Sequence, residues 1–200
     1  MPRRIDCESC RKPPALCYCH LIRQHVNEWP VRLLQHHREK GHARGTARIA
    51  QLSLNTLSTV ELRDREVFAP PAEERESWCD AILLYPGEDG GAVDIASLKG
   101  SAPRPLIVVD GTWRKSKAIV LGSPYLQSLP RYSFSTEAKP RYRIRKASRA
   151  DFFSTLEAIV FALSAVETGA AGYAQMLEVM DWMVDQQLRF IERSSADEAR

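Results

Sequence analysis

The chain has 200 residues, 44% hydrophobic and 26% charged, with a formal net charge of +3. This length allows one domain with a sizeable core, and the composition is typical of a globular protein. No apolar run approaches the roughly 18 residues that a membrane span needs, which excludes a membrane protein. The start, MPRRIDCESC, lacks the apolar stretch of a secretory signal, so we expect a cytoplasmic protein with no membrane partner.

Residues 1–30 differ from the rest because they hold four of the five cysteines. Cys7, Cys10, Cys17 and Cys19 form a C-x2-C-x6-C-x-C array, and four thiolates within 13 residues suit a structural tetrahedral zinc site. Two disulfides, or a redox role for the C-x2-C half, are the alternatives. We therefore predict a zinc-binding segment over residues 1–30 and a separate domain over 31–200. Cys79 stands alone, and we expect a buried, inert thiol there.

Short apolar runs alternate with helical patterns after Pro30. Strands are predicted over residues 31–37, 58–64, 80–86, 105–110 and 131–135. One helix is predicted from Thr46, with Ile49, Leu52 and Leu57 on one face, and another over 114–121. Two amphipathic helices follow, separated by a break at residues 169–172, and the tail SSADEAR is expected to fray. The alternation indicates an α/β domain with a mostly parallel sheet.

Ligands of such sheets bind beyond the carboxyl ends of the strands. Two strand ends fit this position, namely Tyr85–Pro86–Gly87 and Asp110–Gly111–Thr112–Trp113. Asp110 or Thr112 also suits a helix cap, and Trp113 suits packed core, a stacking wall or a contact with a cation. There is no G-x-G-x-x-G motif and no P-loop, so a dinucleotide or nucleoside triphosphate site is not supported.

Basic residues gather in two places. After the first predicted strand stand His36, His37, Glu39, His42, Arg44 and Arg48, which suit phosphate binding or acid–base chemistry but match no zinc spacing. Residues 131–149 contain seven Lys or Arg and one acid, Glu137. This segment indicates a surface for phosphate-rich partners, with a solvated loop as the alternative.

Together these pieces resemble the DTW-domain family, the tRNA-uridine aminocarboxypropyltransferases. The naming motif D-x-T-W is present as Asp110–Gly111–Thr112–Trp113. The cysteine array, Leu84–Tyr85–Pro86, the region of Thr46 and Arg48, YRIRK at 142–146 and STLEA at 154–158 are also similar to the family's motifs, in the same order. One departure is His36–His37, where the family is expected to have His-Pro.

The resemblance implies a SPOUT-like α/β fold with a knotted C-terminal region that binds the donor, S-adenosylmethionine. The implied reaction moves the 3-amino-3-carboxypropyl group to N3 of a tRNA uridine and releases methylthioadenosine. Asp110, Thr112 and Trp113 are the expected catalytic residues. The expected donor-binding residues are Leu84, Tyr85, Pro86, Gly87, Asp110, Gly111, Ser154, Thr155 and Glu157. The expected tRNA-binding cations are Arg48, Arg114, Lys115, Lys117, Arg141, Arg143, Arg145 and Lys146.

Two points stay open at this level. Asp110 is either the base that takes the N3 proton or an anchor for the donor, since an ordinary Asp is a poor base for so weak an acid. The alternative functions are a SPOUT-type RNA methyltransferase using S-adenosylmethionine, and a zinc-containing RNA-binding module without catalysis.

Overall fold

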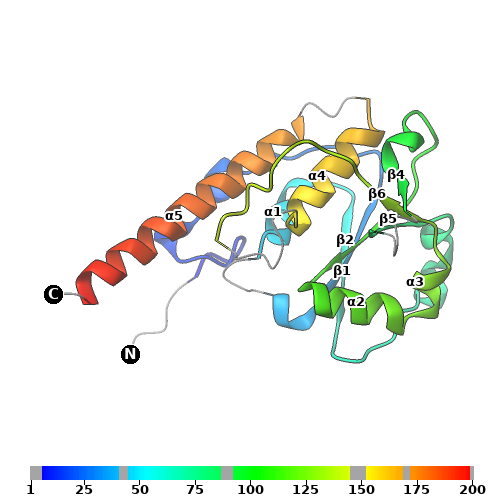
Figure 1. Ribbon diagram of the computed structural model, residues 1–200, viewed down its shortest axis with the longest axis horizontal. Helices are drawn as coiled ribbons and strands as arrows, with labels where there is room; N and C mark the ends of the chain where they lie inside the picture. Colours follow the sequence, from blue (N-terminus) through cyan, green and yellow to red (C-terminus); the bar gives the residue numbers. More distant parts are fainter. Residues whose placement is uncertain (1–5, 41–44, 87–91, 145–151, 169–171, 199–200) are drawn as a thin grey trace.

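A computed structural model describes residues 6–40, 45–86, 92–144, 152–168 and 172–198, with side chains up to residue 192. Its centre is a six-stranded sheet in the order β2-β1-β5-β3-β6-β4, and every pairing is parallel (Figure 1). The strands are β1 (Val31–His36), β2 (Leu57–Leu62), β3 (Ile82–Leu84), β4 (Val93–Asp94), β5 (Leu106–Asp110) and β6 (Arg131–Ser133). The prediction of an α/β domain with a parallel sheet is therefore confirmed.

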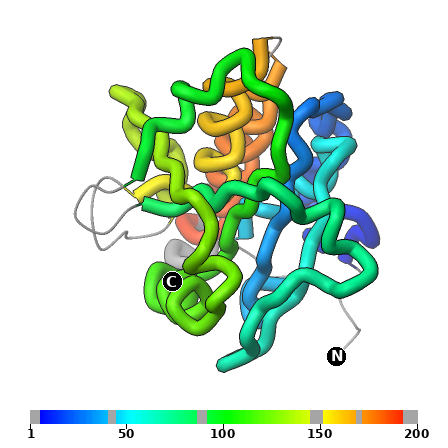
Figure 2. The backbone as a smooth tube through the Cα atoms, turned by 90° about the vertical axis from the view of Figure 1, so that its right-hand side faces the viewer, coloured from blue at the N-terminus to red at the C-terminus, as the bar shows by residue number. Residues whose placement is uncertain are grey.

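Helices cover both faces of this sheet. They are α1 (Ala47–Ser53), α2 (Trp113–Gly122), α3 (Pro124–Ser128), α4 (Thr155–Val166) and α5 (Ala174–Glu198). Short 3-10 helices are η1 (Pro14–Leu16), η2 (Cys19–Leu21), η3 (His37–Glu39), η4 (Ala72–Trp78) and η6 (Ile95–Leu98). Helices α1, α4 and α5 pack together on one side, whereas α2 and α3 pack together on the other (Figures 1 and 2).

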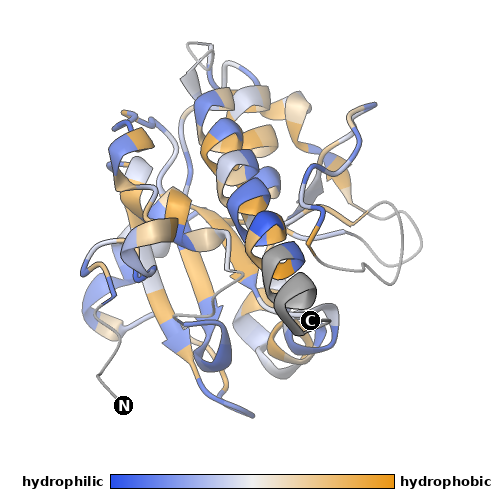
Figure 3. Cartoon of the chain, turned by 90° about the vertical axis from the view of Figure 1, so that its left-hand side faces the viewer, coloured by the Kyte–Doolittle hydropathy of each residue, from blue (hydrophilic) through white to orange (hydrophobic). Residues whose placement is uncertain are grey.

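The period of two along the strands produces these layers. Val31 and Leu33 of β1 point into the core shared with α1, α4 and α5, whereas Leu34 points into the second core with α2 and α3. A strand buried on both faces needs apolar residues at nearly every position, and the strands are coloured mainly as hydrophobic in Figure 3. Helix α5 is amphipathic, so only part of its circumference joins the core.

Residues 1–30 share the first of these cores. Tyr18 and Trp29 are fully buried there, next to residues of α4 and α5. Glu167, at the end of α4, accepts a hydrogen bond from the backbone N–H of Trp29 at 2.9 Å and one from the hydroxyl of Tyr173 at 2.5 Å. No helix among the described residues is both long and apolar enough to cross a membrane.

Several predicted boundaries were wrong for local reasons. Leu57 does not continue the helix from Thr46, because α1 ends at Ser53 and Leu57 begins β2. Strand β3 covers only Ile82–Leu84 of the predicted 80–86. Strand β4 and helix α3 were not predicted, since two residues and five residues leave almost no periodicity. Helix α5 continues to Glu198 and so includes part of the tail SSADEAR, whose expected fraying stays a prediction.

Candidate functional site

Asp110 is the last residue of β5, at the carboxyl edge of the sheet. The parallel register places Gln35 of β1 directly beside it. The Gln35 side-chain amide donates to Asp110 Oδ2 at 2.8 Å, and the Thr155 hydroxyl of α4 donates to Asp110 Oδ1 at 2.6 Å. The Asp110 residue is 8% exposed. Two strands and a helix distant in sequence thus hold one buried carboxyl group.

Both carboxyl oxygens of Asp110 have hydrogen-bond donors in the structure. The two donors are the neutral side chains of Gln35 and Thr155. A buried carboxylate at a strand end is a suitable partner for a cationic group, such as an ammonium or a sulfonium.

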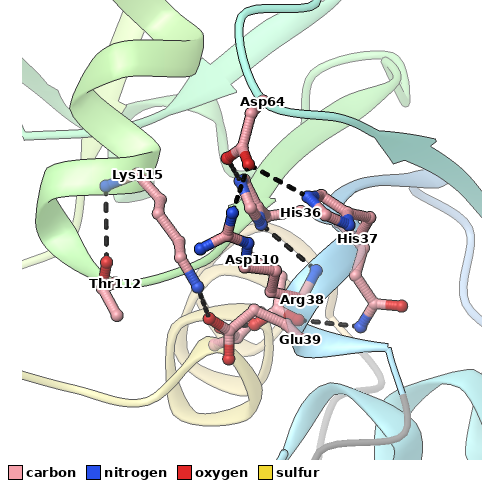
Figure 4. Close-up of polar contacts among 10 residues, drawn as sticks. His36, His37, Arg38, Glu39, Asp64, Asp110, Thr112 and Lys115 are labelled. Carbon is pink, nitrogen blue, oxygen red and sulfur yellow. Dashed lines mark hydrogen bonds and ion pairs between the residues drawn. The ribbon is translucent and has the colours of Figure 1, made fainter.

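Thr112 and Trp113 follow Asp110 at the start of α2. Thr112 is the N-cap residue, and its hydroxyl accepts the Lys115 N–H at 3.4 Å, so the cap is Thr112 and not Asp110 (Figure 4). Gly111 allows this tight turn, because a Cβ there would lie 3.2 Å from the Cβ of Lys115. Trp113 is 41% exposed, which is high for so large an aromatic residue.

Trp113 belongs to a group of three aromatic rings. Its centroid lies 4.7 Å from that of Phe152, with an interplanar angle of 37°, and 5.9 Å from that of Tyr85. Tyr85 follows β3, and Phe152 precedes α4. The structure therefore brings the two predicted strand ends and the start of α4 to one place. An exposed aromatic surface beside a carboxylate suits a ligand that carries both a flat ring and a positive charge.

The loop after β1 closes the other side of this site (Figure 4). His36 Nε2 lies 2.9 Å from Asp64 Oδ1, and its Nδ1 accepts the N–H of Arg38 at 3.2 Å. The His36 hydrogen bond is the main reason why the pKa of Asp64 is lowered. The loop then places Glu39 against Lys115 of α2, with 2.8 Å between Oε1 and Nζ.

His36, His37 and Asp64 lie close enough together to be considered as a metal site. The hydrogen bonds of His36 oppose it. Because Nδ1 accepts an N–H, the ring proton of a neutral His36 sits on Nε2, which is then a donor to Asp64 and has no lone pair for a metal. We therefore interpret these three side chains as a hydrogen-bonded cluster that holds the loop after β1 against the segment after β2.

Helix α4 begins with a capping box. The Ser154 hydroxyl accepts the Glu157 N–H at 3.3 Å, and Glu157 accepts the Ser154 N–H at 2.7 Å. Glu157 is fully buried and also accepts the backbone N–H of Arg141 at 2.6 Å. Its carboxylate thus holds two backbone segments together, while Thr155 of the same turn reaches Asp110.

The predicted donor-binding residues differ in their surroundings. Tyr85, Asp110 and Thr155 meet at the edge of the sheet, whereas Glu157 and Ser154 bond to backbone. Leu84 is buried at the end of β3, Pro86 is exposed, and Gly87 lies outside the described residues.

The predicted RNA-binding cations also fall into groups. Arg114 and Lys117 are exposed on α2, while Lys115 is bound to Glu39. Arg141 and Arg143 pair with Asp181 and Asp185 of α5, which ties their segment to that helix. Arg48 donates twice to the Ser9 carbonyl, at 2.8 and 2.5 Å. The last two predicted cations lie outside the described residues, namely Arg145 and Lys146.

The cysteine array is assembled as four converging thiols. Sγ of Cys7 lies 3.6 Å from that of Cys19, and Sγ of Cys10 lies 3.7 Å from that of Cys17. A tetrahedral zinc with bonds of about 2.3 Å places neighbouring sulfurs about 3.8 Å apart, so the four residues fit this ion. Backbone N–H groups of Cys10 and Ser9 lower the pKa of the Cys7 thiol to about 6, whereas burial raises the pKa of the Cys10 and Cys19 thiols, so a bound ion would have to displace protons from these two.

The described cysteines form no disulfide, so the alternative of two disulfides does not hold in this structure. The prediction for the fifth cysteine was wrong, because Cys79 is exposed. It lies at the end of η4, and the side chain of its neighbour Trp78 takes the buried position instead.

Sequence reasoning missed two residues of the site. Gln35 is the residue that positions Asp110 from β1, and its signal was available only as a polar residue near the end of a buried strand. Phe152 precedes α4 and packs on Trp113, and nothing in the local sequence pattern sets it apart from the apolar residues of that helix.

Comparisons with known proteins agree with this picture. The sequence profile of the family described as DTW domain matches residues 4–188. The chain is 29% identical to a tRNA-uridine aminocarboxypropyltransferase 2 of Drosophila melanogaster, over 83% of this chain and 68% of that protein. It is 25% identical to the protein of that name from Macaca fascicularis, over 82% of this chain. It is 24% identical to a tRNA-uridine aminocarboxypropyltransferase A of Arabidopsis thaliana, over 95% of this chain and 83% of that protein.

The match covers 57% of the Macaca fascicularis protein, so the chain spans little more than half of some relatives. No solved structure matches the chain.

Proposed function

Because the chain belongs to the DTW-domain family, we propose that it is a tRNA-uridine aminocarboxypropyltransferase. In the proposed reaction, N3 of a tRNA uridine attacks the γ-carbon of the 3-amino-3-carboxypropyl group of S-adenosylmethionine. The N3–C bond forms as the C–S bond breaks, the sulfur keeps the electron pair, and methylthioadenosine leaves. The N3 proton is lost to a base. The family match over residues 4–188, with relatives that carry this name, is the observation on which the proposal rests.

The chemistry of the donor suits the site at the edge of the sheet. S-adenosylmethionine carries a sulfonium and an ammonium, and both are cations that a buried carboxylate attracts. The exposed ring of Trp113, flanked by Tyr85 and Phe152, offers a flat surface for adenine or a face for the sulfonium. Which carbon on the sulfur lies in line with N3 then decides whether the aminocarboxypropyl group or the methyl group is transferred.

We assign Asp110 the role of donor anchor rather than base. The donors Gln35 and Thr155 occupy both carboxyl oxygens, so the group is held in place by the fold and suits a fixed anchor better than a group that must take up a proton. Thr112 supports this arrangement indirectly, since its cap fixes the start of α2 and hence Trp113.

The remaining parts of the proposal concern the framework. We propose a SPOUT-like arrangement with a knotted donor region, to which the ends of β3 and β5 contribute. We propose a structural zinc on Cys7, Cys10, Cys17 and Cys19, which would brace residues 1–30 and supply no free coordination position for chemistry. The exposed Arg114 and Lys117 on α2 are proposed to contact tRNA, together with cations of the segment 131–149.

Mass spectrometry of nucleosides tests the function directly. Unmodified tRNA is incubated with the protein and S-adenosylmethionine, then digested. The expected results are a uridine heavier by one aminocarboxypropyl group, and methylthioadenosine in equal amount. Methylated nucleosides with S-adenosylhomocysteine would replace the proposal by a methyltransferase. An absence of donor binding by calorimetry would favour a module that binds RNA without catalysis.

A further inference from the structure

A cavity lies beside the site, on the β1–β2 side of the sheet. Its volume is about 360 Å³, and it is lined by residues of the cysteine segment, β1, α1 and β2. Arg11 and Lys12 come from the C-x2-C loop, Arg48 comes from α1, and Gln35 comes from β1. The proposed donor chemistry uses the aromatic side of the sheet edge, and none of the three aromatic residues lines this cavity.

The lining residues that the structure describes carry an excess of positive charge. Two of them are acids, and each is bound to a lysine. Glu61 pairs with Lys40 at 2.5 Å, and Glu39 pairs with Lys115 at 2.8 Å. The other charged lining groups are all cations, namely Arg11, Lys12 and Arg48. A cavity of this size with such a charge balance selects for an oxyanion.

The side chain of Gln35 connects the cavity with Asp110. Gln35 lines it, and the amide of Gln35 donates to Asp110 Oδ2 at 2.8 Å. In the proposed reaction the uridine base lies near the donor at Asp110, so we expect the backbone of the same RNA strand within reach of the cavity. Arginine is the side chain best suited to a phosphate there, because its planar fork donates two parallel hydrogen bonds.

We propose that this cavity binds a backbone phosphate of the RNA, next to the uridine that enters the site. The proposal rests on the proposed function, of which it names a further subsite. Arg11 supplies the accessible cation, and Lys12, which is 5% exposed, follows it in the chain and also lines the cavity. The RNA backbone is then bound on one side of Gln35, and the donor is bound on the other side.

A competing role for these cations is to balance the negative charge of a zinc tetrathiolate. Cys10 also lines the cavity, and Arg48 holds the carbonyl of Ser9 within the C-x2-C loop. The two roles differ in what a charge-removing substitution changes. A counterion of the metal site affects zinc content, whereas a phosphate ligand affects the salt dependence of RNA binding.

The test compares Arg11→Gln with Arg23→Gln in the full-length, zinc-loaded protein. Both positions are exposed, both lie in the N-terminal segment, and both substitutions remove one positive charge, but Arg23 does not line the cavity. Affinity for unmodified tRNA is measured at several salt concentrations. We expect Arg11→Gln to reduce the slope of log K against log salt by about 0.7–0.9, and Arg23→Gln to leave it as in the wild type. Lys12→Gln is a second variant, with the same reduction expected.

Equal slopes for Arg11→Gln, Lys12→Gln and the wild type would overturn the proposal. So would an unchanged slope with loss of zinc, which would assign the cations to the metal site. An unchanged slope with weaker binding of S-adenosylmethionine would assign the cavity to the donor carboxylate instead. Nucleoside analysis of the same RNA keeps the proposed function separate. A wild type that forms no product would refute that function, while the slopes still decide whether the cavity binds phosphate.

Discussion

Asp110→Asn separates the two roles that the sequence left open. The substitution removes the charge but keeps the shape. The new amide still pairs with Gln35 if the Gln35 amide turns its oxygen toward it, and the Thr155 hydroxyl can donate to the remaining oxygen. We therefore expect a change in the free energy of unfolding of less than about 1.5 kcal/mol.

Donor binding should change much more. An interaction with a charged group contributes about 1.5–3 kcal/mol net, and each 1.4 kcal/mol corresponds to a tenfold change in Kd. We expect the Kd for S-adenosylmethionine, measured by calorimetry, to rise roughly 10- to 150-fold in Asp110→Asn. Thr155→Val is the matched control, because it removes one hydrogen bond to Oδ1 and leaves the charge in place. Its effect on Kd should be smaller, about threefold to tenfold.

An unchanged Kd in Asp110→Asn would refute the anchor. If product formation were nevertheless lost, Asp110 would be the base that takes the N3 proton. If neither binding nor product formation changed, the carboxyl group would serve only the packing of β1, β5 and α4.

Three further predictions concern the framework. Glu157→Ala leaves two partly buried N–H groups without their acceptor and should lower the free energy of unfolding in urea by about 2–4 kcal/mol. Cys10→Ser should abolish zinc binding, measured by metal analysis, and lower Tm, and a chelator should lower the Tm of the wild type in the same way. The lowered pKa of Asp64 contributes stability above the ordinary Asp pKa of about 4, which is lost as pH falls through the still lower folded-state pKa. In Asp64→Asn, the Tm should therefore fall less steeply than in the wild type as the pH is lowered below about 4.

Each of these has an outcome that contradicts it. Unfolding of Glu157→Ala at the wild-type urea midpoint would mean that water replaces the carboxylate at both N–H groups. Wild-type protein that contains no zinc after purification in the presence of zinc would contradict the proposed zinc site in residues 1–30. An equally steep fall of Tm in Asp64→Asn and the wild type would show that the contacts with His36 and Arg38 are not maintained in solution.

The D-x-T-W motif and the cysteine array could be recognised in the sequence because they depend on the order of neighbouring residues. The apolar run ending at Asp110 identified both the strand and its end, since a β-branched segment followed by Asp–Gly leaves few alternatives. The spacing of Cys7, Cys10, Cys17 and Cys19 identified the thiol cluster for the same reason. The capping pattern Ser154–Glu157 lies at the start of α4, although both residues were expected at the donor.

The order of the strands in the sheet could not be predicted from the sequence, and the site depends on that order. The sheet order puts β1 beside β5 although 69 positions separate His36 from Leu106, so Gln35 meets Asp110 only through the register. The pairing of Lys115 with Glu39 has the same origin, and the RNA-binding role expected of Lys115 stays a prediction.

The sequence by itself determined the class of fold, the strand end at Asp110, the thiol cluster and the family, because periodicity, spacing and motif order are properties of neighbouring residues. The tertiary structure decided which groups face one another. It gave Asp110 two hydrogen-bond donors, gave Trp113 its aromatic neighbours, and placed Arg11, Lys12 and Arg48 around one cavity. These contacts join segments far apart along the chain, and hydrogen bonding and charge balance act through space, so their energies exist only once the sheet has formed.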